Sequence, residues 1–175
     1  MRRKLLLSGI LLVFLSCNPA EKDQKNTLTY FDIKGYFEKE VLRLARINPL
    51  VTKTVAVNEL PETKQIRITD WTKELSAFSD ADINRSAWRG LFNKKSTGQE
   101  EVYSSDDKKV PVKELTITKR NGQVYGIRIL IRYSNVLYSS ADTLSYFPDS
   151  LYQVKKKQQI KLLDEKNYSI TGRFK

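Results

Sequence analysis

A run of alternating large side chains constrains the fold of this chain more than any other feature. Tyr125, Ile127, Ile129, Ile131 and Tyr133 occupy every second position and are separated mostly by polar or smaller residues. A period of two places such residues on one face of a β-strand. The chain must therefore build a sheet that buries this face. If that sheet curves around a cavity, the same five side chains are the candidate ligand-facing surface.

An Asn-Gly dipeptide just before this strand predicts a tight hairpin turn. A two-residue loop would place the apolar faces of the two strands out of step. A three-residue loop over residues 120–122, with the glycine left-handed in a bulge, sets Ile117 opposite Tyr125. It likewise sets Leu115 opposite Ile127. Because register follows the buried face, we expect the three-residue loop.

Other segments also predict strands. Residues 50–58 and 64–69 are rich in β-branched side chains and read as a hairpin with a turn at 59–63. From residue 110 the chain is nearly all β, with further strands at about 136–147, 151–156, 158–163 and 168–174. The polar stretch at 94–108 is expected to be a mobile loop.

Two segments have helical periodicity. In residues 30–47, Ile33, Phe37, Val41 and Leu44 lie on one face, and Asn48-Pro49 ends the pattern. We expect this face to pack on the sheet rather than on a membrane surface. Residues 70–92 form a second helical region, capped at Thr69 or Asp70 and divided into two short helices at a second cap, Ser79.

Together these elements predict an α+β fold. The N-terminal amphipathic helix and the second helical segment would pack on a curved, mainly antiparallel sheet of about six to seven strands. Residues 27–175 have the length of one domain, and the 40% hydrophobic content of the chain is enough for one core.

The N-terminus has the pattern of an export signal. Cationic residues 2–4 precede an almost wholly apolar stretch of about eleven residues, Leu5–Leu15, which is too short to cross a bilayer of ~30 Å. Residues 1–16 are therefore predicted to be a signal peptide. Cys17 follows and is the only cysteine, so it cannot form an internal disulfide.

The sequence Phe14-Leu15-Ser16-Cys17 resembles the lipobox of bacterial lipoproteins, with Phe14 where the family usually has leucine. The resemblance implies a lipid on the Cys17 sulfur, cleavage before Cys17 and acylation of the new amino group. Residues 17–26 would then be a lipidated, flexible tether to a membrane. Asn18 in place of aspartate favours the outer membrane over the inner membrane, by resemblance to the enterobacterial sorting code.

The amino-acid composition limits the catalytic and metal-binding chemistry that the chain can perform. The chain has no histidine, which excludes Ser-His-Asp triads, Cys-His dyads and His-ligated metal sites. Asp80 with Asp82, and Asp106 with Asp107, lack the remaining ligands of a calcium loop. We expect no metal and no cofactor. Carboxylate chemistry, Ser-Lys chemistry or no chemistry remains.

The charge of the chain is basic. Without residues 1–16 it has 28 basic and 20 acidic residues, a net charge of +8. Outside the cytoplasm the partners of such a surface are headgroups, lipopolysaccharide phosphates and acidic glycans rather than nucleic acid. Lys155, Lys156 and Lys157 are the candidate anion contacts. The alternative is that these lysines protect a sheet edge from aggregation.

At the level of element order, the expected fold is similar to the half-barrel of lipoprotein carrier proteins and to cystatin-like folds. The body of the chain also resembles envelope lipoproteins of the Bacteroidetes, a resemblance that implies no activity. Three functions follow, in this order: a tethered interaction or assembly module that docks an envelope protein; a carrier of a lipid or other amphipathic ligand; and a hydrolase that pairs Asp70 or Glu74 with Asp80 or Asp82.

Overall fold

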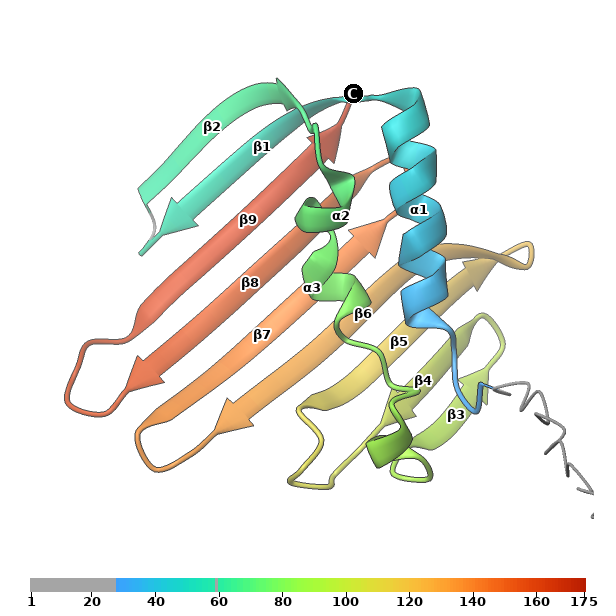
Figure 1. Cartoon of the computed structure of the whole chain (residues 1–175), viewed down its shortest axis with the longest axis vertical. Helices are drawn as coiled ribbons and strands as arrows, with labels where there is room; N and C mark the ends of the chain where they lie inside the picture. Colours follow the sequence, from blue (N-terminus) through green and yellow to red (C-terminus); the bar gives the residue numbers. More distant parts are fainter. Residues whose placement is uncertain (1–27, 59) are drawn as a thin grey trace, which may run out of the picture.

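One antiparallel sheet makes up most of the structure (Figure 1). The computed structural model describes residues 28–58 and 60–175, in which nine strands lie in the order β2-β1-β9-β8-β7-β6-β5-β4-β3. The predicted signal peptide, Cys17 and the tether lie outside the described residues. The strands are β1 Leu50–Val57, β2 Leu60–Arg67, β3 Asn93–Thr97, β4 Glu100–Ser104, β5 Val112–Arg120, β6 Gln123–Ser134, β7 Tyr138–Phe147, β8 Leu151–Ile160 and β9 Lys166–Phe174.

The predicted α+β class with six to seven strands is wrong. The structure is 52% strand and only 18% helix, and its sheet has nine strands among the described residues. Two causes account for the difference. Helical periodicity over residues 70–92 overstated the helical content, and a polar segment assigned to a loop forms two more strands. The separate strands predicted at 151–156 and 158–163 are one strand, β8.

The N-terminal helix α1, Ile33–Ile47, lies within the segment 30–47 that the helical periodicity predicted. The Asp32 side chain accepts a hydrogen bond from the Gly35 amide and caps the helix, and a side chain at Gly35 would collide with that carboxylate. Asn48 ends the helix in the left-handed conformation, directly before Pro49. The predicted core face is confirmed, because Ile33, Phe37 and Leu44 are buried.

The second helical region is much shorter than predicted. It consists of α2 Trp71–Glu74, α3 Ser76–Ser79 and the 3₁₀ turn η1 Ser86–Trp88. The cap at Asp70 is confirmed, since its side chain accepts a hydrogen bond from the Lys73 amide. The predicted cap at Ser79 is wrong, because Ser79 is the last residue of α3. The chain after α3 is instead held by hydrogen bonds between the Asn84 side chain and the backbone of Tyr30 and Phe31.

The segment assigned to a mobile loop at 94–108 contains the β3–β4 hairpin. β3 lies at an edge of the sheet and every one of its side chains is exposed. Such a strand has no buried face and therefore no apolar alternation to reveal it. In β4 the pattern is sparse, with Tyr103 buried opposite Leu115.

The β5–β6 hairpin corrects the predicted loop. Arg120 pairs with Gln123, so the loop has two residues, and both of them have positive φ. A bulge then restores the buried face: the register shifts after Thr118, and Ile117 lies opposite Ile127. The buried faces of the two strands are aligned, as predicted. A bulge inside the strand aligns them, however, instead of a longer turn.

The bulge has a second effect on β6. Val124, opposite Lys119, packs against the core. Tyr125 therefore turns to the other face, where it contacts Phe147 at a ring-centroid separation of 6.3 Å. Arg120 stacks on the Tyr125 ring, 3.4 Å from its centroid.

The predicted β1–β2 hairpin is confirmed, with a shorter turn than 59–63. Val57 pairs with Leu60, so most of the predicted turn belongs to β2. β2 is the other edge of the sheet and tolerates Pro61, whose missing N–H would interrupt an inner ladder. β1 also pairs with β9, which joins this hairpin to the rest of the sheet.

Three aromatic rings at the centre of the core fix the helices on the sheet. Phe37 of α1, Phe78 of α3 and Tyr146 of β7 are fully buried. Their ring centroids are 4.9 Å apart for Phe37 and Phe78, and 5.1 Å and 6.0 Å for the contacts of these rings with Tyr146. Such pairs add stability beyond the burial of their area. This aromatic trio therefore positions α1 and α3 over β7.

A hydrogen-bond network extends the contact between α1 and β7. The Tyr146 hydroxyl donates to the Glu40 carboxylate, which also pairs with Arg43 at 2.8 Å. Arg43 reaches across to Asp149 in the β7–β8 turn at 2.6 Å. Glu40 is mostly buried, so these partners keep its charge hydrogen-bonded within the protein.

Gly172 of β9 provides the first test. It lies opposite Tyr152 of β8, whose buried ring occupies the space that a side chain at this position would need. We expect Gly172→Ala to lower the free energy of unfolding by about 1–3 kcal/mol, because the ring must move in a packed core. Chemical denaturation measures the change. Ser169→Ala, on the opposite face of the same strand, is the control and should change stability far less; equal effects would contradict the packing argument.

Candidate functional site

The helices cover only part of one face of the sheet, called here the inner face. In Figure 1, α1 lies over the right side of the sheet and α2 and α3 lie near its centre, and the lower left ends of β1, β9, β8 and β7 carry no helix. Side chains in this uncovered part follow the alternation from Tyr152, which packs on Trp71 of α2. Val154 comes two residues later, Ile170 lies opposite Val154, and Val55 lies opposite Ile170. An apolar strip therefore continues beyond the helices.

Two adjoining hollows separate this strip from α2 and α3. The hollow beside α2 has a volume of about 510 Å³ and the hollow beside α3 about 270 Å³. Ala77 and Val154 line both of them. We call the two together the inner groove. Its floor is sheet, and its wall is the pair of short helices.

The hollow beside α2 contains a partly buried polar network. The Glu74 carboxylate pairs with the Lys53 ammonium at 2.7 Å and accepts a hydrogen bond from the Tyr152 hydroxyl at 2.6 Å. Burial raises the pKa of Tyr152 above its ordinary value, and the negative charge of Glu74 raises it further. The network joins α2 to β1 and β8 and holds the wall of the groove in place.

The hollow beside α3 contains a buried acid with an unused acceptor. Asp142 of β7 is 8% exposed, and its Oδ2 pairs with Lys156 at 3.1 Å. Its Oδ1 has no hydrogen-bond partner in the described part of the chain, and neither has the Oγ of buried Ser140. A buried acceptor without a partner costs stability, which a donor brought by a ligand would recover.

The rim of this hollow carries charges of both signs. Arg85 donates a hydrogen bond to the Asp80 carbonyl at 2.6 Å, and its guanidinium lies 4.8 Å from the centroid of the Trp88 ring. Asp80 and Lys156 complete the charged lining, and Ile131 and Leu144 supply apolar floor. The site therefore suits a group with an apolar body and an N–H or O–H donor directed at Asp142.

The five alternating residues predicted to face a ligand do not form one surface. Ile127, Ile129 and Ile131 are buried in the core, and only Ile131 reaches the groove. Tyr133 is about half exposed and also lines the hollow beside α3. Tyr125 points to the outer face because of the bulge. The helices cover this part of the sheet and occupy the space where a cavity was expected.

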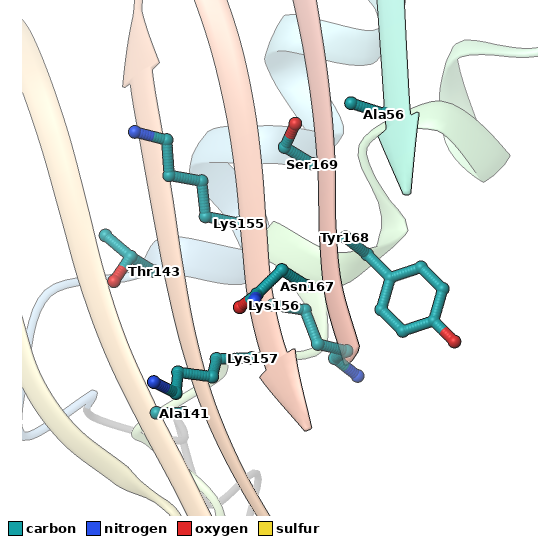
Figure 2. Close-up of a pocket in the computed structure, with 9 residues that line it drawn as sticks. All are labelled: Ala56, Ala141, Thr143, Lys155, Lys156, Lys157, Asn167, Tyr168 and Ser169. Atoms are coloured by element: carbon teal, nitrogen blue, oxygen red, sulfur yellow. The ribbon is translucent and has the colours of Figure 1, made fainter. Parts of the chain in front are cut away.

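The three candidate lysines are separated by the alternation of β8. Lys155 and Lys157 lie on the outer face beside a hollow of about 420 Å³, and Lys156 lies on the inner face with Asp142 (Figure 2). Lys157 pairs with Glu165 at 2.8 Å. Because β8 is an inner strand, the edge-protection explanation for this run is wrong. The three lysines do not form a single anion site.

The carboxylates proposed for hydrolysis have structural partners. Asp70 caps α2, and Glu74 is held by Lys53 and Tyr152. Asp82 accepts a hydrogen bond from the Asn84 amide, while Asp80 lines the other hollow. The pairs suggested by sequence spacing are thus not brought together in one hollow. Within the described ranges there is no cluster of three or more metal-ligating side chains.

Asp142, Val154 and Ile170 were not among the site residues predicted from the sequence. A signal existed for Asp142, because it interrupts an alternation of Tyr138, Leu144 and Tyr146 that marks the inner face of β7. An acid at such a position needs a buried partner. For Val154 and Ile170 no local pattern distinguishes an open sheet face from a covered one.

Comparison with protein-family models, with curated proteins and with solved structures finds no match. Among the residues that the structure describes, none of the helices is both long and apolar enough to cross a membrane.

The buried tyrosines predict an alkaline limit of stability. Burial, together with Glu40 or Glu74, raises the pKa of Tyr146 and Tyr152 in the folded protein above the ordinary value of 10.0. The unfolded chain releases these protons near pH 10 while the folded protein retains them. Stability is therefore complete below about pH 10 and falls as the pH rises further.

Denaturant titrations at about pH 8 to 11 measure this decline. Tyr152→Phe removes one of the groups and should make the decline shallower. An unchanged slope in that variant would contradict the contribution of Tyr152.

Proposed function

We propose that this protein is a non-catalytic binding module of the cell envelope, and that its inner groove holds a segment of a partner protein. One observation carries the proposal: an open apolar strip leads to a buried carboxylate oxygen, Asp142 Oδ1, that has no partner within the described residues. A peptide segment supplies both apolar side chains and N–H donors. It would also match the charges of both signs on the rim.

The alternative is a carrier for a lipid or another amphipathic ligand. The groove is open to solvent along the uncovered part of the sheet, whereas a carried acyl chain needs apolar surroundings on all sides. The hollow beside α3 is lined by the acids Asp80 and Asp142 as well as by Arg85 and Lys156, so it offers charges of both signs instead of the purely cationic site that would suit a fatty-acid carboxylate. These features favour a partner protein over a lipid.

We further propose that Cys17 tethers the module to a membrane, with the outer membrane favoured. Cys17 and the lipobox-like residues before it support this proposal, together with the apolar segment Leu5–Leu15. Several acyl chains on one residue hold a protein on a bilayer almost permanently. A tethered module meets its partner at the membrane surface, where even a weak contact in the groove becomes effective.

Photocrosslinking in intact envelopes of the native host tests the groove. A photoreactive amino acid replaces Ile170, which faces the groove, or its neighbour Thr171, which faces the other side of the sheet. We expect a discrete protein adduct from position 170 and none of that size from position 171. Asp142→Ala should weaken the adduct several-fold, while Asp142→Asn keeps an acceptor oxygen and should preserve most of it.

Adducts of equal yield from both positions, or none from position 170, would contradict the proposed groove. Lipid extracted from the purified chain in stoichiometric amount, and lost in the Asp142→Ala variant, would establish the carrier instead.

The tether has its own test. A clickable fatty acid supplied to cells that express the full chain should label the protein, and Cys17→Ala should abolish the label because the acceptor sulfur is gone. The substitution should also leave the signal peptide uncut and the protein heavier by residues 1–16. Labelling that survives Cys17→Ala would contradict lipidation at this residue, whatever the result for the groove.

A further inference from the structure

Two neighbouring hairpin turns at one end of the sheet expose large aliphatic side chains. Figure 1 shows the β6–β7 and β8–β9 turns side by side at one end of the sheet. Val136 and Leu137 belong to the first turn, Leu162 and Leu163 to the second, and all four side chains are exposed. Val136 is 86% exposed and Leu162 is 96% exposed. A hydrogen bond of 2.9 Å from the Lys161 amide to the Leu137 carbonyl joins the two turns. We call these four residues the aliphatic tips.

The tips are held in defined conformations. Asn135 Oδ1 accepts hydrogen bonds from the amides of Leu137 and Tyr138, at 2.9 Å and 2.8 Å. In the other turn, Leu162 has a φ of 67°, a conformation that favours glycine or asparagine over leucine. Hairpin turns normally carry small or polar residues at such positions. Here the backbone instead presents leucine to the surroundings.

Four cationic residues lie in or beside the two turns. Lys161 lies in the β8–β9 turn and Lys166 begins β9, while Arg132 and Lys157 line a hollow on the adjoining outer face. Two acids lie nearby: Glu165, which Lys157 neutralises at 2.8 Å, and Asp164. The surroundings of the tips therefore carry a positive excess.

We infer that the aliphatic tips insert into the headgroup region of an anionic lipid surface. Exposed aliphatic side chains gain from entering a bilayer, and the surrounding cations gain from anionic headgroups. A protein partner would explain the apolar tips, but the cationic excess complements lipid phosphate more directly. This contact is separate from the tether at Cys17 and from the groove, and it does not depend on either.

Vesicle co-sedimentation of residues 18–175 tests the inference. All buried core side chains of the structure lie between Ile33 and Tyr152, so this chain keeps the whole core, and circular dichroism checks its folding. The vesicles are phosphatidylcholine alone or phosphatidylcholine with phosphatidylglycerol. We expect binding to the anionic vesicles, weakened by salt, and much less to the neutral ones.

Variants at the tips separate insertion from simple charge attraction. Leu137→Gln with Leu162→Gln should reduce vesicle affinity at least about tenfold, because the apolar contribution to binding is lost. Lys161→Gln should reduce it about fivefold. The matched controls are Leu42→Gln and Lys34→Gln on α1, exposed residues away from the tips. Both should leave the affinity unchanged.

Three results would overturn the inference: no binding to anionic vesicles, equal losses in the α1 controls, or full binding by the double leucine variant. If the chain forms dimers in solution that the double variant abolishes, without any effect on vesicle binding, the tips are an interface between copies of this chain instead.

Discussion

The contact among Phe37, Phe78 and Tyr146 determines what the remainder of the sheet can do. These rings hold α1 and α3 over β7, and α2, which is only four residues long, covers β1, β8 and β9 along a short part of their length. The apolar strip at Val154 and Ile170 therefore stays open. A groove forms where the covered and uncovered parts of the sheet meet. The candidate site is thus a consequence of core packing and of a short helical segment.

Polar groups near this boundary fall into two kinds. Glu40 and Glu74 each accept a hydrogen bond from a buried tyrosine and pair with a cation, and both connect a helix to the sheet. Asp142 also pairs with a cation, but one of its oxygens is buried without a donor. Networks that are fully hydrogen-bonded stabilise a fold, whereas an incomplete one marks a place where a ligand can contribute.

Sequence patterns identified the elements whose buried face is unbroken, such as α1 and most of β6. They failed where that face is absent or interrupted. β3 has no buried side chain, and the bulge after Thr118 reverses the orientation of Tyr125 although the sequence continues to alternate. The three lysines at Lys155–Lys157 suggested a break between two strands, although they lie within one strand and their side chains alternate between its two faces. The groove could not be predicted, since its position depends on contacts between helix and sheet that no local pattern records.

The pairing of β1 with β9 has a consequence for how the chain reaches this structure. The hairpin at residues 50–67 is synthesised early, yet its inner partner is the strand that ends at Phe174. Closing so long a loop is slow, and until then Val51 and Val55 lie on an unpaired strand edge. The first hairpin therefore keeps one edge exposed until β9 pairs with it, and the groove that β9 helps to line exists only after that step.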